Sequence, residues 1–373
     1  MGFKLNGKEG KGNIIACLES NLGYELQEIK IHLTKRCNSN CIMCEGGQNC
    51  DPALEISREQ IRKIEEEAKQ LGLRQVKYFG GEPTLRRDLV DLVDDCNSLG
   101  ISSHITSNGL LIDQEKARQL VAAGLKAIVL SLDSPFAETH DYIRGVPESY
   151  EKMMKAIAAL DDERRKQGSG LSLQVNCVVM KYNWQHLPEL LKLCAAMKVD
   201  KVSLNPITPD SPAKDGCQKD LTIHFPTREE VVAYNRDIIP QMLADGSAMK
   251  FGLTEQHLQV FGVTDEEIDS AMRGLMVDSL LRGNLCFKPW YFANINQDSK
   301  LIACNHVKEC PEFPIGDLKE HSILELWNSE KYKAFRQKCK TPLDSFKSCS
   351  YCCFPYAIHN QKLNEKLRKN GKE

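Results

Sequence analysis

The sequence predicts an α/β fold: a parallel sheet, either curled into a partial barrel or open and doubly wound, followed by a smaller cysteine-rich unit. Between about residues 27 and 205, six short apolar, β-rich runs alternate with amphipathic helical patterns. After residue 205 this alternation stops, and seven of the 16 cysteines lie between 286 and 353. A chain of 373 residues also exceeds the size of a usual single core, which favours two units.

Each strand is predicted from a short apolar run bounded by polar or turn residues. The runs are 27–34, 75–79, 102–106, 126–133, 171–180 and 199–205. The first helix, 57–72, begins with Ser57 and Gln60 as a capping box and ends on Gly72. The remaining helical patterns of this part are 87–99, 113–124, 149–167 and 184–197. In either form of the sheet, the site is expected at the C-terminal ends of the strands.

The rest of the chain is less regular. Residues 206–225 form a long loop with Pro, Asp and Gly, which is typical of a functional lid or a linker. Helical patterns follow at 227–245 and 264–282, and residues 361–373 predict a charged, solvated helix. The predicted units are an N-terminal extension (1–26), the barrel (27–205), a loop and helical bridge (206–285), the cysteine-rich domain (286–353) and a charged tail (354–373).

Composition excludes several classes of protein. The net charge is -2, so neither nucleic acid nor a membrane surface is an expected partner. No apolar run reaches the length of a membrane span, and the first residues lack the apolar core of a signal peptide. We therefore expect a cytoplasmic protein with reduced thiols, in which clustered cysteines bind metal.

Three cysteines follow the first strand with the spacing C-x3-C-x2-C: Cys37, Cys41 and Cys44. Thiolates so spaced can bind one corner of a [4Fe–4S] cluster and leave one iron open for a substrate or cofactor. A zinc site would need a fourth ligand, for which Cys50 is the local candidate. A redox or unbound role is the third alternative.

A second group of cysteines lies near the C-terminus. Cys286 and Cys304 are followed at a distance by Cys349 and Cys352, a C-x2-C pair. Four such thiolates can enclose a complete iron–sulfur cluster or a zinc ion. Three further cysteines are possible substitutes or a second partial site: Cys310, Cys339 and Cys353.

The first cysteine motif and the segment 80-GGEP-83 after the second strand together resemble the radical S-adenosylmethionine (SAM) enzymes. Segments 106–112, 129–135, 140–145 and 174–181 add to the likeness. The resemblance implies a partial (β/α)6 TIM-like barrel, a [4Fe–4S] cluster on Cys37, Cys41 and Cys44, and SAM on the open iron.

The resemblance also implies SAM-binding residues. Gly80 and Gly81 would let the backbone approach the ligand, and Glu82 would accept hydrogen bonds from the methionyl amine. The candidate contacts to the SAM carboxylate or ribose are Ser107, Ser131, Asn176 and Arg144. A serine at a strand end can instead only cap the following helix. Tyr78, Gln174, Asn205 and His224 are further candidates for facing the substrate.

Segments 286–304 and 315–337 resemble the C-terminal domains called SPASM and, in a shorter form, twitch. Cysteines stop at Cys353, and the glycine usual before the second cysteine is replaced around Ser299–Lys300. This favours the twitch form, with one auxiliary [4Fe–4S] cluster on Cys286, Cys304, Cys349 and Cys352.

The resemblance implies an oxidoreductase that cleaves SAM to a 5′-deoxyadenosyl radical, which abstracts a substrate hydrogen atom. A reductant such as flavodoxin or ferredoxin would supply the electron. Because only 26 residues precede the first strand, we expect a small substrate (a sugar, cyclitol or natural-product intermediate), dehydrogenated while the auxiliary cluster accepts an electron. The alternatives are a radical epimerase with Cys217 as hydrogen donor, a peptide-modifying maturase, and a non-catalytic metal-binding module.

Overall fold

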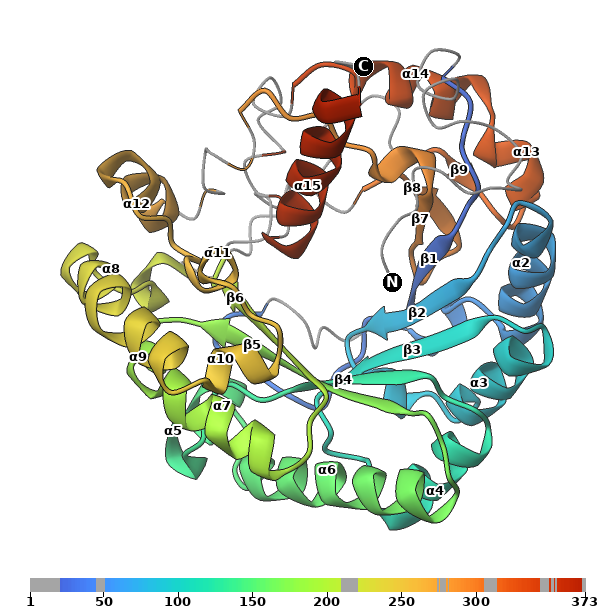
Figure 1. The fold of residues 1–373 in the computed structure, drawn as a ribbon. Coiled ribbons are helices and arrows are strands. Elements are labelled where there is room, and N and C mark those ends of the chain that lie inside the picture. The colour runs from blue at the N-terminus through green and yellow to red at the C-terminus, as the bar shows by residue number, and fades with distance from the viewer. Residues whose placement is uncertain are drawn as a thin grey trace.

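The computed structural model describes residues 21–44, 51–208, 221–273, 275, 280, 282–304, 314–342, 349, 352 and 354–370. Within them, one sheet has the strand order β6-β5-β4-β3-β2-β1-β7-β8-β9 (Figure 1). The strands β1 to β7 are paired in parallel, and β8 and β9 are antiparallel. The sheet curves and carries helices on its convex side, so the predicted α/β partial barrel is confirmed.

The strands begin and end close to the predicted runs. Their bounds are β1 Glu28–Thr34, β2 Gln75–Gly80, β3 Ser102–Ser107, β4 Ala127–Ser131, β5 Ser172–Val179, β6 Lys201–Pro206, β7 Phe292–Ile295, β8 Lys300–Ile302 and β9 Gly316–Asp317. The helices of the barrel are α2 Arg58–Gln70, α3 Leu89–Ser98, α4 Gln114–Ala122, α5 Ala137–Arg144, α6 Ser149–Lys166 and α7 Leu187–Ala196.

Shorter helices follow the barrel. They are α8 Arg228–Ala233, α9 Ile239–Ala244, α10 Ser247–Lys250, α11 Glu255–Leu258, α12 Asp265–Met272, α13 Ile323–Trp327, α14 Glu330–Lys338 and the longer α15 Phe354–Asn370. A π-helical turn, Tyr234–Ile238, joins α8 to α9. None of the described helices is long and apolar enough to cross a membrane.

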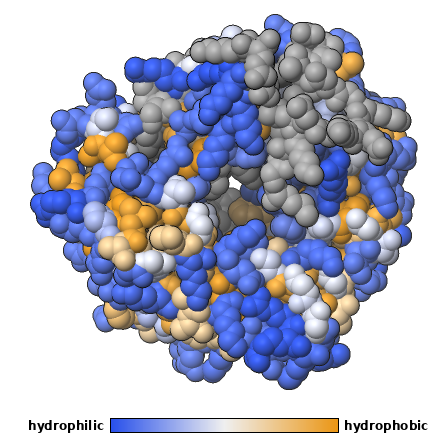
Figure 2. Space-filling model, in the orientation of Figure 1, coloured by the Kyte–Doolittle hydropathy of each residue, from blue (hydrophilic) through white to orange (hydrophobic). Residues whose placement is uncertain are grey.

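The two faces of the sheet differ in polarity. Because side chains alternate along a strand, Ile29, Ile31 and Leu33 of β1 lie on one face, where they are fully buried. The opposite, concave face carries Glu28, Lys30 and His32, and in-register pairing places mostly polar residues of the neighbouring strands on the same face, together with Phe79 opposite His32. Figure 2, seen from the same side as Figure 1, shows a mostly hydrophilic surface with a hollow near its centre. The concave face is therefore suited to a polar ligand rather than to a packed core.

The cysteine-rich segment continues the barrel's own sheet. Strand β7 follows Cys286 and pairs in parallel with β1, in the register Glu28↔Phe292 to Ile31↔Ile295. The sequence predicts six parallel strands and does not reveal this seventh one, because its four residues lack any distinguishing alternation. The consequence is that β1, which leads into Cys37, and β7, which follows Cys286, lie side by side.

The C-terminal helix is not the solvated tail that the sequence predicts. Helix α15 buries Ala357, Ile358 and Leu363, together with the polar side chains of Asn360 and Asn364. Figure 1 shows α15 beside the open side of the barrel, and it contacts β6. Its charged residues are exposed on the other side of the helix: Lys362, Glu365, Lys366, Arg368 and Lys369.

The capping box predicted at the start of α2 forms only in part. The Ser57 side chain accepts a hydrogen bond from the Gln60 backbone, as in a capping box. The Gln60 side chain instead accepts a hydrogen bond from Ser299 Oγ at 3.0 Å. A long-range contact thus replaces the second, local half of the motif.

Helix α2 also presents a buried carboxyl to the sheet. Tyr78, on the convex face of β2, donates a hydrogen bond of 2.7 Å to Glu65 Oε1 and is fully buried. Tyr78 therefore does not face a substrate, in contrast to the sequence prediction. Burial raises the pKa of Glu65 to about 7, although the hydrogen bond from Tyr78 opposes this.

The raised pKa of Glu65 predicts that stability falls with increasing pH. Between pH 4.5 and about 7, the Glu65 carboxyl keeps its proton in the folded protein but loses it in the unfolded chain. The stabilisation is therefore complete below pH 4.5 and is lost as the pH rises through 7. We expect Glu65→Gln to reduce the loss between pH 5 and pH 8, which should be about 3 kcal/mol in the unsubstituted protein. Urea unfolding at both pH values measures it. Glu66→Gln, at an exposed neighbouring position, is the control, and an equal effect of both substitutions would contradict the prediction.

Candidate active site

The loop with the first three cysteines begins where β1 ends, at the C-terminal edge of the sheet. Cys37 and Cys41 are partly buried and Cys44 is exposed. Two backbone hydrogen bonds hold the loop to the end of α5: Asn40 N to Arg144 O at 3.2 Å and Ile42 N to Ile143 O at 3.0 Å. A Cβ on Gly145 would lie 2.2 Å from Asn40 O, so this close approach requires glycine.

The two glycines after β2 contact the same loop. Gly81 N donates to Thr34 O at 2.7 Å, and Glu82 N donates to Arg36 O at 2.8 Å. A Cβ on Gly80 would lie 2.3 Å from Thr34 O, and one on Gly81 would lie 2.1 Å from Arg36 O. In the described structure, both glycines therefore allow the end of β2 to pack against the residues that lead into Cys37. The expected approach to a ligand remains a prediction.

Glu82 is buried and already has several hydrogen-bond donors. Its Oε1 accepts from Thr84 N, Thr84 Oγ1 and Ser107 Oγ at 2.7–3.0 Å, and its Oε2 accepts from Asn108 N at 2.7 Å. Burial raises the pKa of Glu82, whereas these hydrogen bonds lower it. A carboxylate has about four acceptor directions, so Oε2 retains one for a further donor. Glu82 thus joins the ends of β2 and β3.

Asn108, which the sequence analysis does not single out, extends this connection to the cysteines. Its Nδ2 donates to Asn38 Oδ1 at 2.8 Å and Ser39 Oγ at 2.9 Å, and lies 3.9 Å from Cys37 Sγ. Ser107 is buried and donates to Glu82, so its hydroxyl connects protein groups. The signal was present in 106-TSNG-109, where a polar turn follows a strand.

Arg144 lies between the cysteine loop and the strand ends. Its Nη2 is 2.6 Å from Asp133 Oδ2, and its Nη1 is 3.8 Å from Cys41 Sγ. Asp133 is fully buried, and its Oδ1 accepts from Val178 N at 2.9 Å. Burial raises the pKa of Asp133, whereas the Arg144 guanidinium, which keeps its proton, and the hydrogen bond from Val178 N favour the charged carboxylate. Arg144 Nε has no partner among the described residues, and it is the part of this side chain left for a ligand.

The remaining predicted SAM contacts lie on the concave face. Ser131 and Asn176 are neighbours in register on β4 and β5. Asn176 Oδ1 accepts a hydrogen bond from Asn205 Nδ2, and Asn205 Oδ1 is buried without a partner among the described residues. His32, on the same face, has its pKa lowered to about 3 by burial and by Lys30 and Lys35, so it is neutral. Ser131, Asn176 and Asn205 thus form a row of neutral hydrogen-bonding side chains across β4, β5 and β6, and His32 lies on the same face of the sheet on β1.

His224 lies at the rim of this region. Tyr182 Oη and His224 Nδ1 are 3.1 Å apart, and Tyr182 contacts Tyr142 of α5. Cys217, the proposed hydrogen donor, lies outside the described residues, as do Cys50, Cys310 and Cys353. Their predicted roles remain predictions.

The second group of cysteines gathers beside β7. Burial raises the pKa of Cys349 strongly, and the charges of Cys286 and Cys304 add to this, so these three thiols lie near one another. Cys352 N donates to Cys349 O at 2.9 Å. Burial raises the pKa of Tyr291, and the charges of Cys286 and Cys352 add to this, so both thiols lie near Tyr291. Burial also raises the pKa of Cys286, whereas Lys288 and Asn360 lower it. Cys339 lies near the same set, because burial raises the pKa of Tyr332 and the charges of Cys339, Cys304 and Cys286 add to this.

Ser299 lies where the resemblance to SPASM domains leads us to expect a glycine, and its backbone has a conformation that glycine favours. Its φ is +69°, in the left-handed region that glycine adopts without strain. Ser299 is fully buried, and its hydroxyl donates to Gln60. This contact offsets part of the cost of a side chain at a left-handed position.

The donor set fits iron–sulfur clusters. Cysteines of a cubane bind different irons, so their sulfurs lie farther apart than the ligands of a single ion. Amide and guanidinium N–H groups directed at Cys37, Cys41 and Cys286 are the partners that cluster thiolates require.

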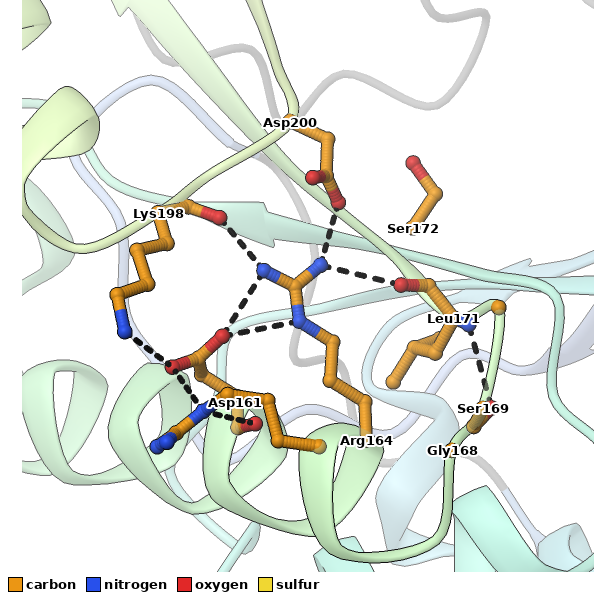
Figure 3. A pocket seen from close by; sticks show the side chains of 10 residues that line it. Asp161, Arg164, Gly168, Ser169, Leu171, Ser172, Lys198 and Asp200 are labelled. Atoms are coloured by element: carbon orange, nitrogen blue, oxygen red, sulfur yellow. Dashed lines mark hydrogen bonds and ion pairs between the residues drawn. The ribbon is translucent and has the colours of Figure 1, made fainter.

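A surface depression of about 590 Å³ lies elsewhere, at the N-terminal start of β5 (Figure 3). Arg164 at its centre bonds Asp161, Asp200 and the carbonyl groups of Leu171 and Lys198. These acceptors satisfy the guanidinium, and the depression is at the opposite end of the strand from the cysteines. Arg164 therefore has a structural role here: it connects α6 to the residues that lead into β5 and β6.

Comparison with known protein families identifies the family to which this chain belongs. The radical SAM superfamily profile matches residues 31–211, and that of the SPASM iron–sulfur cluster-binding domain matches residues 286–353. The chain belongs to the radical SAM superfamily and carries a SPASM domain. The predicted family and its cofactors, [4Fe–4S] clusters and SAM, are thereby confirmed, and the chain is a radical SAM enzyme.

Relatives that are named as enzymes differ in what they act on. An AdoMet-dependent heme synthase from Oleidesulfovibrio alaskensis is 25% identical over 324 residues, which cover 86% of this chain and 78% of the relative. A PqqA peptide cyclase from Granulibacter bethesdensis is 24% identical over 316 residues, covering 81% and 74%.

Solved structures share the fold. Streptococcus suis SuiB bound to its precursor peptide SuiA has a TM-score of 0.62 at 19% identity, covering 90% of this chain and 77% of SuiB. The structure of anSMEcpe with AdoMet and the Cp18Cys peptide has a TM-score of 0.58 at 16% identity, covering 88% and 89%. These likenesses concern the fold.

Proposed function

We propose that this radical SAM enzyme modifies a peptide side chain oxidatively, with Cys37, Cys41 and Cys44 holding the SAM-binding cluster and Cys286, Cys304, Cys349 and Cys352 holding an auxiliary cluster. SAM bound at the open iron supplies, on reduction, the 5′-deoxyadenosyl radical that abstracts a hydrogen atom. Its other partner is a reductant such as flavodoxin or ferredoxin.

The observation that carries this proposal is the adjacency of β1 and β7. Cys37 follows the end of β1 and Cys286 precedes the start of β7, so the parallel pairing places the two cysteine groups at opposite ends of neighbouring strands, with the concave face between them. A substrate bound on that face would lie between the two groups, and an auxiliary cluster held by the second group would supply an acceptor for the electron that follows hydrogen abstraction. Asn176, Asn205 and His32 offer neutral hydrogen-bonding groups suited to peptide amides.

The protein residues near the first cysteines have positioning roles in this proposal. Glu82, Ser107 and Asn108 hold the ends of β2 and β3 against the cysteine loop, and Glu82 Oε2 can accept a further bond from the methionyl amine. Arg144 directs Nη1 toward Cys41, and its Nε remains for the SAM carboxylate. Ser131 and Asn176 face the same space as candidates for ribose contacts.

A second candidate is modification of a small molecule. It is favoured by the match to the heme synthase over most of this chain. The sugar or cyclitol dehydrogenation expected from the sequence belongs to this class, although no relative named above acts on such a substrate. Epimerisation with Cys217 as hydrogen donor is a further form of either candidate.

Transfer of deuterium tests these candidates. The anaerobically reconstituted enzyme, SAM and dithionite are incubated with an extract of cells grown in deuterated medium, and mass spectrometry measures deuterium in 5′-deoxyadenosine. We expect incorporation that disappears when the extract is first digested with proteases. Incorporation that survives digestion would favour a small molecule. Absence of 5′-deoxyadenosine under every condition would contradict the radical SAM reaction itself.

A further inference from the structure

Helix α15 presents two buried asparagines to the segment around Cys286. Asn360 and Asn364 are one helical turn apart, so they lie on the same face of the helix. Their exposed fractions are 1% and 5%. Burying an amide side chain is unfavourable unless its groups are hydrogen-bonded, so the partners of both residues identify what this face of the helix contacts.

Both asparagines bond the residues that flank Cys286. Asn364 Oδ1 accepts from Leu285 N at 3.0 Å, and its Nδ2 donates to Leu285 O at 3.0 Å. Asn360 Oδ1 accepts from Phe287 N at 3.1 Å. The backbone is therefore held on both sides of the cysteine by side chains from a segment about 74 residues away.

The remaining group of Asn360 is directed at the cysteine itself. Its Nδ2 lies 3.7 Å from Cys286 Sγ, within the range of an N–H to sulfur hydrogen bond. A neutral thiol is a weak acceptor, whereas a metal-bound thiolate accepts such a bond well. A buried amide donor directed at sulfur therefore fits the state in which Cys286 is a cluster ligand.

Helix α15 is anchored on its other side as well. Gln256 Nε2 of α11 donates to Gln361 Oε1 at 2.7 Å, and Lys362 Nζ lies 3.3 Å from His257 Nε2. Near its C-terminal end, Arg368 Nη2 donates to Gly283 O at 2.8 Å. The helix thus has fixed contacts on two sides, which makes it able to hold Cys286 in one orientation.

We propose that α15 is a clamp on the auxiliary cluster and that Asn360 is a positioning residue whose amide N–H bonds the Cys286 thiolate and raises the reduction potential of that cluster. Hydrogen bonds to cluster sulfurs stabilise the more negative, reduced state, so they raise the potential. This inference rests on the auxiliary cluster of the proposed function. It assigns to the C-terminal helix a part in setting how readily the cluster accepts an electron.

The test uses the full chain with Cys37, Cys41 and Cys44 replaced by alanine, so that the auxiliary cluster is observed alone. Potentiometric titration monitored by electron paramagnetic resonance measures its midpoint potential. Asn360→Asp keeps the oxygen that holds Phe287 N and removes the N–H donor. Asn364→Asp adds the same charge one turn away while leaving the sulfur contact in place, so it is the matched control.

We expect Asn360→Asp to shift the midpoint potential to a more negative value than Asn364→Asp does. Equal shifts in the two variants would show an effect of charge alone and overturn the role of the hydrogen bond, as would an unchanged potential. If Asn360→Asp lost its iron while Asn364→Asp kept it, the positioning role would be supported. A parent protein that binds no iron would overturn the auxiliary cluster itself. Because a midpoint potential can be measured only when iron is bound, that outcome is distinct from a failure of the role proposed for Asn360.

Discussion

Replacing Asp133 with alanine is expected to destabilise the fold by about 3–5 kcal/mol, because it leaves the buried Arg144 guanidinium without its counter-charge. Asp133 is fully buried, and its Oδ2 lies 2.6 Å from Arg144 Nη2. Its Oδ1 also satisfies Val178 N, which would lose its acceptor. Urea denaturation measures the free energy of unfolding.

The consequence should extend to the cysteine loop, since Arg144 O accepts the hydrogen bond from Asn40 N. The control is Glu151→Ala, which breaks an exposed ion pair with Lys155 and should change stability little. Adding Arg144→Met to Asp133→Ala removes the unpaired charge and should restore part of the lost stability. If Asp133→Ala were no more destabilising than the control, the buried ion pair would not have the role described here.

Replacing Cys37, Cys41 and Cys44 together with alanine is expected to abolish SAM cleavage and to remove about four irons per chain, the content of one cubane. The auxiliary cluster should remain, because its four proposed ligands lie beside β7 and depend on none of these residues. Iron analysis and chromatography of 5′-deoxyadenosine after reduction measure the two effects.

Cys339→Ala is the matched control for the cysteine substitutions. Cys339 is partly buried near Cys286 and Cys304 but is not among the proposed ligands, so its replacement should leave iron content and SAM cleavage unchanged. Loss of iron in this variant would place Cys339 in the auxiliary cluster. SAM cleavage that persisted in the triple variant would refute the assignment of the first cluster.

The strands of the barrel were predictable because each is a short apolar run whose limits are set by adjacent turn residues. The glycines at 80 and 81 were predictable as places of close approach, but their described partner is the backbone of Thr34 and Arg36. Tyr78 was misassigned because a strand's alternation shows that two faces exist, not which one the helices cover. Burial against Glu65 of α2 decides that face.

Long-range contacts account for the remaining differences. The short strand β7 is defined by its pairing with β1, which its own residues do not reveal. The charged sequence of α15 conceals a packed face, because Asn360 and Asn364 read as surface residues until their partners at 285–287 are known. In both cases the deciding neighbours are far away in the chain.

The chemistry of this protein can be recognised from local sequence patterns: the spacing of Cys37, Cys41 and Cys44 and the GGEP segment one strand later are typical of radical SAM enzymes. How the cysteines are held depends on contacts between segments that are distant in the chain. Asn108 reaches Cys37, Arg144 reaches Cys41 and Asn360 reaches Cys286 only after the sheet has formed and its helices have packed. The physical reason is that a ligand's spacing is set by adjacent residues, whereas its hydrogen-bond partners are set by the folding of distant segments against it.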